Sequence, residues 1–207
     1  IDSAAFVTLA EDSLFARTLG VDTGTIEGYL YPDTYFFRPE TKPATMIEKM
    51  AGQFMKVFDD TLRARADSLN MSVAEVVTLA SIIECEATAD EERPLISAVF
   101  HRRLKKNHPL EANPTIQYAI GDKRRILYED LEVDSPYNTY RHTGLPPGPI
   151  ASPGLKSIRA ALYPAKTDYL YFVADGNGRH VFSRTIAEHN EAVKDYRRAK
   201  KKAEQSK

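Results

Sequence analysis

The strongest constraint in this chain is a helix pattern from Ser72 to Ala87 with one almost entirely apolar face. It opens with Ser72 and Glu75 in the S-x-x-E spacing of a helix capping box. At about 100° per residue, a single stripe of this helix carries Val73, Val77, Ala80, Glu84 and Ala87. The pattern predicts a helix that buries this stripe and places a carboxylate near its end.

Glu84 is the polar exception on that stripe. An ionised carboxylate among apolar side chains loses several kcal/mol of hydration unless it is paired or its pKa rises. A carboxylic acid that keeps its proton near neutral pH is what a general acid needs. The structural alternative is a frayed last turn, in which the side chain reaches water, a Lys or an Arg. Leu79 and Ile82 are apolar but lie off this stripe, so the buried face is not sharply defined. Spacing alone therefore leaves both interpretations open.

The composition is that of a globular protein with a hydrophobic core. Apolar residues make up 43% and charged residues 28% of the 207 residues, and the net charge is −1. No large basic field therefore predicts nucleic-acid binding. The sequence contains no signal peptide and no apolar run of membrane-spanning length. Because the chain opens at Ile1 within a helix pattern, we expect a fragment that lacks an N-terminal anchor or domain.

Helix patterns dominate the chain outside its middle. The helices that we expect lie at residues 4–19, 43–62, 72–87, 90–107, 152–163 and from 185 onward. An aromatic segment, EGYLYPDTYFF, occupies residues 27–37. Two strand-like runs flank Asp175-Gly176-Asn177-Gly178, which is the strongest hairpin signal in the chain.

The middle of the chain, residues 108–154, is rich in Pro, Gly, Asn and Tyr. A loop region of this length inside a domain is usually functional or disordered, and its many aromatic and φ-restricted residues argue against disorder. We therefore predict a single region, residues 1–207, of the α+β class. It is mainly helical, with a small antiparallel β-sheet (a hairpin) and a long functional Pro/Gly/Tyr-rich loop region.

Several chemistries are disfavoured by the motifs. There is no G-x-S-x-G sequence, and the single Cys85 has no basic neighbour in the sequence that would activate a thiolate. One cysteine also excludes an internal disulfide and a cysteine-rich metal site. The five histidines show no metal-ligand spacing. We expect no metal and no cofactor.

The loop region suits a polymer that carries many hydroxyl and amide groups. Tyrosine offers a flat apolar face with a hydrogen-bonding tip, and Asn and Gln both donate and accept. The substrate-binding residues that we expect are Asn113, Thr115, Gln117, Tyr118, Tyr137, Asn138, Thr139 and Tyr140. The alternative is a packed loop in which the tyrosine rings are buried and the asparagines cap turns.

The number of carboxylates near Glu84 limits the mechanism. Glu86 lies two residues further along the same helix and points nearly the opposite way. Glycosidases that use two carboxylates need the second roughly 5–9.5 Å from the first. Residues 90–92 could approach Glu84 after the turn, but no spacing requires it. A mechanism with one carboxylate is therefore favoured.

Five motifs together resemble the endolytic murein lytic transglycosylases of the MltG/YceG-like type, in the family's order. They are EGYLYPDTY at 27–35, VVTLASIIECEA at 76–87, NPTIQYAIG at 113–121, SPYNTYRHTGLPPGPIASPG at 135–154 and YLYFVADGNGRHVFS at 169–183. The resemblance implies that Glu84 is the catalytic acid. The chain departs from the family's usual residues at Cys85, where Lys is common, and at Asn113, where Asp is common. The second departure weakens any role for a second carboxylate there.

The resemblance also implies a reaction. Such enzymes cleave the β-1,4 bond between N-acetylmuramic acid and N-acetylglucosamine without water, leaving 1,6-anhydro ends, and so terminate nascent peptidoglycan strands. The family implies peptidoglycan synthases as partners, and a membrane helix and LysM-like subdomain that this chain lacks. It further implies location at the bacterial inner membrane, facing the periplasm. A lysozyme-type muramidase and a non-catalytic peptidoglycan-binding module are the alternatives.

Overall fold

The computed structural model describes residues 2–21 and 24–205. Its helices and strands are α1 (Ser3–Ala10), α2 (Ser13–Thr18), α3 (Pro43–Val57), α4 (Asp60–Ser68), α5 (Val73–Glu86), η1 (Asp90–Glu92), α6 (Arg93–Lys105), α7 (Asn113–Ile120), η2 (Glu129–Glu132), α8 (Leu155–Leu162), β1 (Tyr171–Ala174), β2 (His180–Ser183) and α9 (Ile186–Gln205). The two strands form one antiparallel sheet. The predicted α+β class, mainly helical with a small hairpin, is confirmed.

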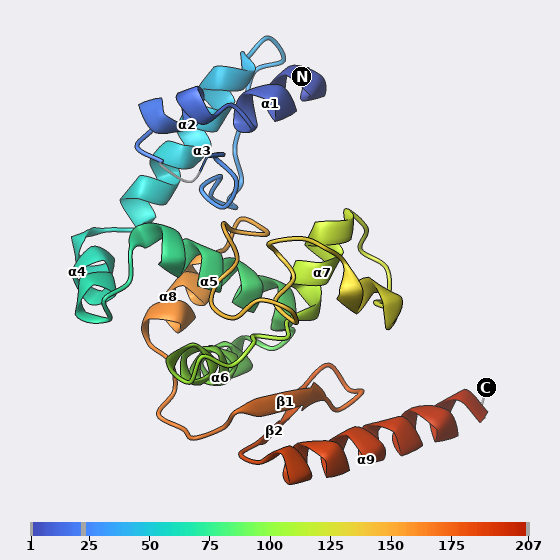
Figure 1. Ribbon diagram of the computed structural model, residues 1–207. Helices are drawn as coiled ribbons and strands as arrows, with labels where there is room; N and C mark the ends of the chain where they lie inside the picture. The colour runs from blue at the N-terminus through green and yellow to red at the C-terminus, as the bar shows by residue number, and fades with distance from the viewer. Residues whose placement is uncertain (1, 22–23, 206–207) are drawn as a thin grey trace.

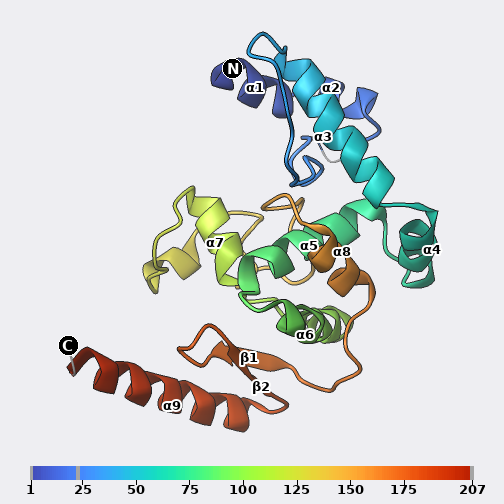
Figure 2. The same ribbon diagram turned by 180° about the vertical axis from the view of Figure 1, so that it is seen from behind.

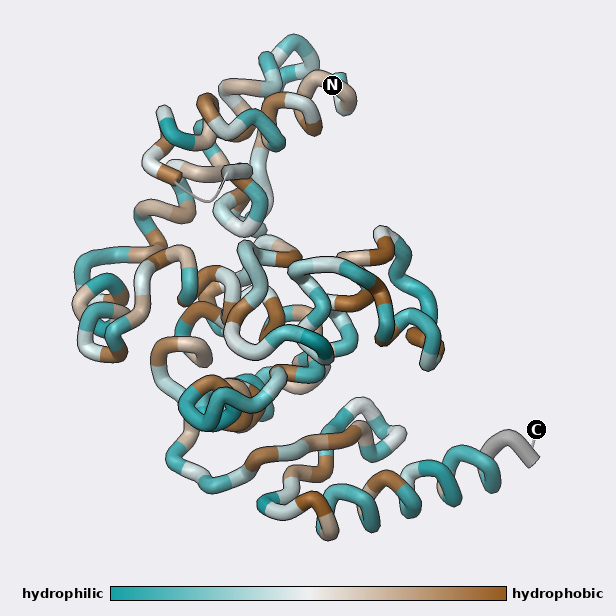
Figure 3. The backbone as a smooth tube through the Cα atoms, viewed as in Figure 1, coloured by the Kyte–Doolittle hydropathy of each residue, from teal (hydrophilic) through white to brown (hydrophobic). Residues whose placement is uncertain are grey.

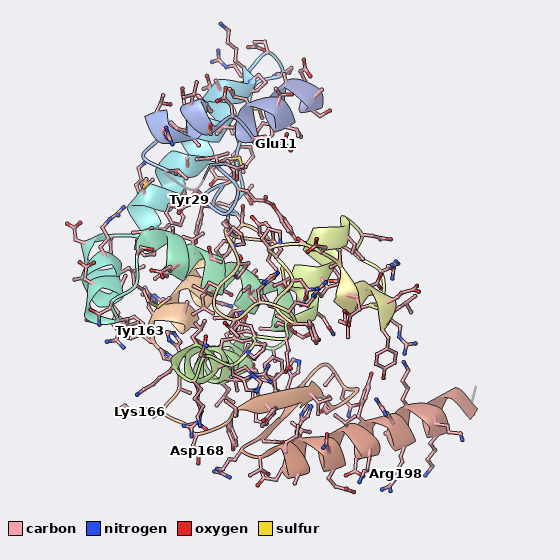
Figure 4. The ribbon with its side chains drawn as sticks, in the orientation of Figure 1. Glu11, Tyr29, Tyr163, Lys166, Asp168 and Arg198 are labelled. Carbon is pink, nitrogen blue, oxygen red and sulfur yellow. The ribbon has the colours of Figure 1, made fainter. Side chains whose placement is uncertain are left out.

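The helices form a stack around α5 (Figure 1). The lobe of α1, α2 and α3 lies at one end, α5 crosses the centre against α8, and α6 lies between α5 and the hairpin. Helix α9 covers the far side of the hairpin and carries the C-terminus, as the reverse view also shows (Figure 2). Glu11 and Arg198, labelled in Figure 4, mark the two ends of the molecule.

The core is built on α5. All eight of its residues from Val76 to Ile83 are buried, and they belong to one cluster that also contains Phe54, Phe100 and Ile158. The expected capping box is present, because the Ser72 hydroxyl accepts from the Glu75 amide and the Glu75 carboxylate accepts from the Ser72 amide. Helix α9 is predominantly hydrophilic along its length (Figure 3).

Two predicted helices are each divided in two. The stretch at residues 4–19 breaks at Asp12, whose carboxylate accepts from the amides of Leu14 and Phe15 and starts α2. The stretch at residues 43–62 breaks after Val57, and Asp59 caps α4 through the Leu62 amide. The apolar spacing continues across both breaks and gives no sign of them. The aspartate caps therefore set the helix boundaries.

The start of α8 also differs from the prediction. The helix begins at Leu155 with Gly154 at its N-cap and no side-chain cap, so Ser152 does not cap it. The hairpin turn agrees with the prediction, because the Asp175 carboxylate accepts from the amides of Asn177 and Arg179. The strands pair in the register Tyr171 with Ser183 and Ala174 with His180.

No single helix within the described ranges is long and apolar enough to span a membrane. The pair α4 and α5 passes on length and composition, but the two helices meet at 94°.

The aromatic segment at residues 27–37 docks on the loop that ends at α8. Gly28 has φ of +84°, and a Cβ there would lie 2.4 Å from Pro149 Cγ and 2.9 Å from Val77 Cγ1. Only glycine lets the backbone approach this closely. The same loop is fixed to α5, because the Ile150 amide donates to the buried Ser81 hydroxyl at 3.0 Å.

We predict that Gly28→Ala destabilises the fold by about 2–5 kcal/mol, the sum of left-handed strain and overpacking. Gly24→Ala is the matched control, because Gly24 has φ of +83° and no atom within 4 Å of a built Cβ. Its folding stability should fall only by the cost of the left-handed strain, about 1–2 kcal/mol. Urea denaturation of both variants measures the difference, and equal losses would contradict close docking at Gly28.

Candidate active site around Glu84

Glu84 lies in the last turn of α5 with its side chain 32% exposed. Two groups fix its carboxylate. Arg93 Nη2 donates to Oε1 at 3.3 Å, and the Gly154 amide donates to Oε2 at 3.1 Å. Both distances exceed the roughly 2.7–2.9 Å of strong charge-assisted bonds. The two donors therefore orient a partly exposed carboxylate while leaving it accessible.

Arg93 is itself held by two other groups and is only 11% exposed. Its Nε donates to Asp90 Oδ1 at 3.0 Å, and its Nη1 donates to Ser157 Oγ at 2.5 Å. Asp90 is also paired with Lys156. This network joins the end of α5, the start of α6 and the first turn of α8. Sequence reasoning missed Arg93, although a carboxylate on an apolar face signals that a cation is needed nearby.

Gly154 brings the backbone up to the carboxylate. A Cβ at this position would lie 3.7 Å from Glu84 Oε2 and 4.0 Å from Pro32 Cγ. Any side chain would therefore project into the space between Glu84 and the aromatic segment. The Gly154 backbone therefore lies in close contact with the Glu84 carboxylate.

The acidic residues that follow α5 are all engaged by other groups. Hydrogen bonds from Lys156 and Arg93 lower the pKa of Asp90. Glu91 pairs with Arg179 at 2.6 Å, and buried Glu92 accepts from the amide and ring of His180 at 3.1 and 2.7 Å. None of the three is a free second carboxylate beside Glu84. This agrees with the preference for a mechanism that uses one carboxylate.

Two of the expected substrate-binding tyrosines form a pair next to the N-terminal lobe. The rings of Tyr118 and Tyr137 lie 4.7 Å apart, and Tyr118 Oη donates to Glu27 Oε2 at 2.6 Å. Burial and this hydrogen bond raise the pKa of Tyr118. Burial also raises the pKa of Tyr137. Both phenols stay neutral and available as hydrogen-bonding groups at physiological pH.

A second pair lies on the other side of α7. Tyr140 Oη donates to Asn113 Oδ1 at 2.7 Å. Burial, followed by the nearby charges of Glu86 and Glu111, raises the pKa of Tyr140 to about 12. Gln117 is partly buried, and its amide donates to the Arg124 carbonyl at 2.8 Å.

Three of the expected substrate-binding residues are corrected by the structure, because their side chains are buried and satisfied within the protein. Asn138 is fully buried and bonds the carbonyls of Leu131 and Val133 and the amide of Tyr140. Thr115 and Thr139 are also buried and share a 2.8 Å hydrogen bond. These side chains shape the loop and cannot contact a sugar in this conformation. For Asn138, Thr115 and Thr139, the packed-loop alternative holds.

Three cavities lie end to end around α7. One of about 500 Å³ is lined by Cys85, Pro114, Gln117, Tyr118, Gly121, Asp122, Lys123 and Ile150. It shares Tyr118 with a cavity of about 550 Å³ that includes Glu27 and Ser152, and Gln117 with one of about 460 Å³ that includes Asn113 and Tyr140. Cys85 and Ser152 are close in sequence to Glu84 and Gly154, so the first two cavities lie near the candidate site.

The part of the chain described contains potential metal ligands and the single thiol. Within it there is no cluster of three or more His, Cys, Asp or Glu residues that could hold a metal. Desolvation raises the pKa of the Cys85 thiol, so Cys85 is a neutral thiol and a poor nucleophile.

Glu86 faces a different environment from Glu84. It is half-buried next to Tyr140 and has no ion pair within residues 2–21 and 24–205. Burial raises its pKa to about 7. The folded protein therefore holds the Glu86 proton more tightly than the unfolded chain does.

We predict that Glu86→Gln stabilises the fold in a pH-dependent way. Protonated Glu86 contributes full stability below about pH 4, and this is lost as the pH rises through about 7. The melting temperature of the variant relative to wild type should therefore rise from pH 4 to 7 and then level off. Glu48→Gln, on the exposed side of α3, is the control. A difference that stays constant from pH 4 to 8 would contradict the burial of Glu86.

Comparison with known proteins agrees with this architecture. The YceG-like family model matches residues 3–195. The chain is 49% identical over 173 residues to an endolytic murein transglycosylase of Bacillus subtilis (strain 168), covering 83% of this chain and 48% of that protein. It is 38% identical over 181 residues to the protein of that name from Streptococcus pneumoniae (strain D39), covering 79% and 32%.

A solved structure shows the same fold. The crystal structure of a yceG-like protein from Listeria monocytogenes superimposes with a TM-score of 0.84 at 38% identity, covering 92% of this chain and 67% of that one. The chain spans about half the length of the Bacillus relative and about a third of the Streptococcus one. With a family match over nearly all of its length and a shared fold, the chain belongs to the YceG-like family.

Proposed function

We propose that this chain is the catalytic region of an endolytic peptidoglycan lytic transglycosylase. The observation that carries the proposal is the Glu84 carboxylate, oriented by Arg93 and the Gly154 amide with no free second carboxylate among residues 90–92. Relatives named endolytic murein transglycosylase support the substrate class.

The proposed reaction uses Glu84 twice. Protonated Glu84 donates to the glycosidic oxygen between N-acetylmuramic acid and N-acetylglucosamine as the bond from that oxygen to C1 breaks. The C6 hydroxyl oxygen of the same muramyl residue then bonds to C1, and its proton passes to the Glu84 carboxylate. The product is a 1,6-anhydro ring, no water is consumed, and Glu84 regains its proton.

Arg93 and the Gly154 amide stabilise Glu84 after it has donated its proton. Both donate to the oxygens that carry the negative charge after proton transfer, which stabilises that charge in a fixed position. The tyrosines and amides around α7 supply flat faces and hydrogen bonds for neighbouring parts of the substrate. The expected substrate contacts that remain, after the three buried residues are set aside, are Tyr118, Tyr137, Tyr140, Gln117 and Asn113.

Two rival functions predict different outcomes. A muramidase of the lysozyme type would need a second carboxylate to activate water or trap the sugar, and the pairing of residues 90–92 does not favour it. A non-catalytic peptidoglycan-binding module would hold strands without shortening them. A partly exposed carboxylate oriented by two donors favours catalysis over binding alone.

We also propose, on the family resemblance, that the whole protein is anchored at the bacterial inner membrane and faces the periplasm. Terminating nascent strands would place it beside peptidoglycan synthases. Fractionation and co-purification of the full-length protein test both points. Recovery of the protein in the cytosolic fraction would contradict the location.

We predict that Glu84→Gln lowers glycan cleavage by ~10²–10⁴-fold, because it removes the transferable proton while keeping the shape of the side chain. Stability should change by less than about 1 kcal/mol, since Arg93 keeps Ser157 and Asp90 as partners. Strand length after digestion is the readout. Glu86→Gln is the matched control and should retain activity. Cleavage by Glu84→Gln near the wild-type rate would refute the mechanism.

We predict that Arg93→Gln lowers kcat by roughly ten- to a hundred-fold, because a misoriented carboxylate reacts poorly. KM should change less, since Arg93 is too buried to bind much of the glycan. Arg179→Gln removes another arginine–carboxylate pair close to the end of α5 and should leave kcat unchanged. An unaltered kcat for folded Arg93→Gln would show that catalysis does not require Arg93 to orient the Glu84 carboxylate.

A further inference from the structure

The cavity between α7, η2 and α9 has a chemistry that the cleavage step does not use. It measures about 460 Å³ and is lined by Asn113, Gln117, Arg125, Ile126, Leu127, Tyr128, Leu131, Tyr140, Tyr196 and Lys200. The set contains two cations, three tyrosines, two amides and no carboxylate. The C-terminal part of α9 lies below α7 and the segment that follows it (Figure 1), and the lining residues of the cavity come from both parts.

The two cations of this cavity are unneutralised. Within the described part of the chain, neither Arg125 nor Lys200 has an ion pair, and both side chains are exposed. Tyr128 is 83% exposed at the same rim. The site therefore presents positive charge beside aromatic faces, a combination that binds an anionic group attached to an apolar or amide-rich chain.

Three of the acids around the cavity are neutralised by other groups. Asp130 is bound by both terminal nitrogens of Arg124, each at 2.6 Å. Glu111 pairs with Arg103 at 2.7 Å, and Asp195 pairs with Arg198 at 3.3 Å. Glu86, on the other side of Tyr140, is half-buried, and Glu129 and Glu132 are exposed on η2. The cavity itself keeps a net positive lining.

The cavity adjoins the cavity that contains Cys85. Gln117 lines both this cavity and the one that contains Cys85, which is the residue after Glu84 on α5. A side branch of a strand at the candidate site would follow α7 past Gln117 to enter the cavity.

We propose that this cavity binds the acidic peptide stem of the substrate, with Arg125 and Lys200 contacting its carboxylates. The proposal rests on the function proposed above, because the stem is the anionic branch that every muramyl residue of peptidoglycan can carry. Tyr128, Tyr140 and Tyr196 contact the apolar parts of the peptide. Asn113 and Gln117 supply hydrogen bonds to its backbone.

The test compares two substrates with and without the stem. Glycan strands that carry peptides and strands stripped by an amidase are digested by wild type and by Arg125→Gln/Lys200→Gln. The double variant should lose about three- to thirty-fold in kcat/KM on stem-bearing strands, as expected for two exposed charge contacts, and nothing on stripped strands. Arg197→Gln/Lys201→Gln removes the same charge from α9 outside the cavity and should lose nothing on either.

Binding of the stem peptide can be measured separately from catalysis. Soluble acidic stem peptide is titrated into Glu84→Gln and into the same variant carrying Arg125→Gln/Lys200→Gln. Weaker binding by the second protein supports the proposal even if wild type cleaves no strand. Equal losses on stem-bearing and stripped strands, unchanged peptide binding, or binding of a polyglycerol phosphate chain in place of the peptide would each overturn it.

Discussion

The placement of a carboxylate at the end of a fully buried helix determines much of the surrounding structure. Residues Val76 to Ile83 of α5 are buried, so Glu84 leaves the interior only in the last turn. There it meets Arg93 from the start of α6 and the Gly154 amide from the start of α8. Three elements distant in the sequence thus converge on one side chain. The loop before α8 is held to the same helix through Ser81, and Gly28 docks against that loop.

The surrounding charges favour a reaction that uses one acid. Each of the three acidic residues in η1 is engaged: Asp90 with Arg93 and Lys156, Glu91 with Arg179, and Glu92 with His180. These pairs also join the end of α5 to the hairpin, so they have a structural purpose of their own. Glu86 is separated from Glu84 by its position near Tyr140. A carboxylate of η1 would have to leave its partner before it could assist Glu84.

Much of the fold was predictable because local signals and burial agreed. The Ser72–Glu75 capping box, the apolar stripe of α5 and the Asp175 turn each formed as their spacing indicates. The breaks at Asp12 and Asp59 were missed, because apolar periodicity continues across them while a cap interrupts the helix. At the site, Glu84 stood out because a charge on an apolar face is unusual. Arg93 and Gly154 could not be assigned to it, since pairing across 9 and 70 positions depends on tertiary packing. The burial of Asn138 could not be predicted either, because the sequence does not distinguish an amide that binds a sugar from an amide that fixes a loop.

The central claim is that Glu84 cleaves the strand with the muramyl C6 hydroxyl as the nucleophile and without water. Digestion of peptidoglycan strands in ¹⁸O-labelled water, followed by mass spectrometry of the new ends, tests it most directly. The one-carboxylate mechanism predicts muramyl ends that are lighter by one water than reducing ends and carry no ¹⁸O. These ends should disappear with Glu84→Gln. Reducing ends that carry one ¹⁸O atom would instead show hydrolysis and contradict the one-carboxylate mechanism.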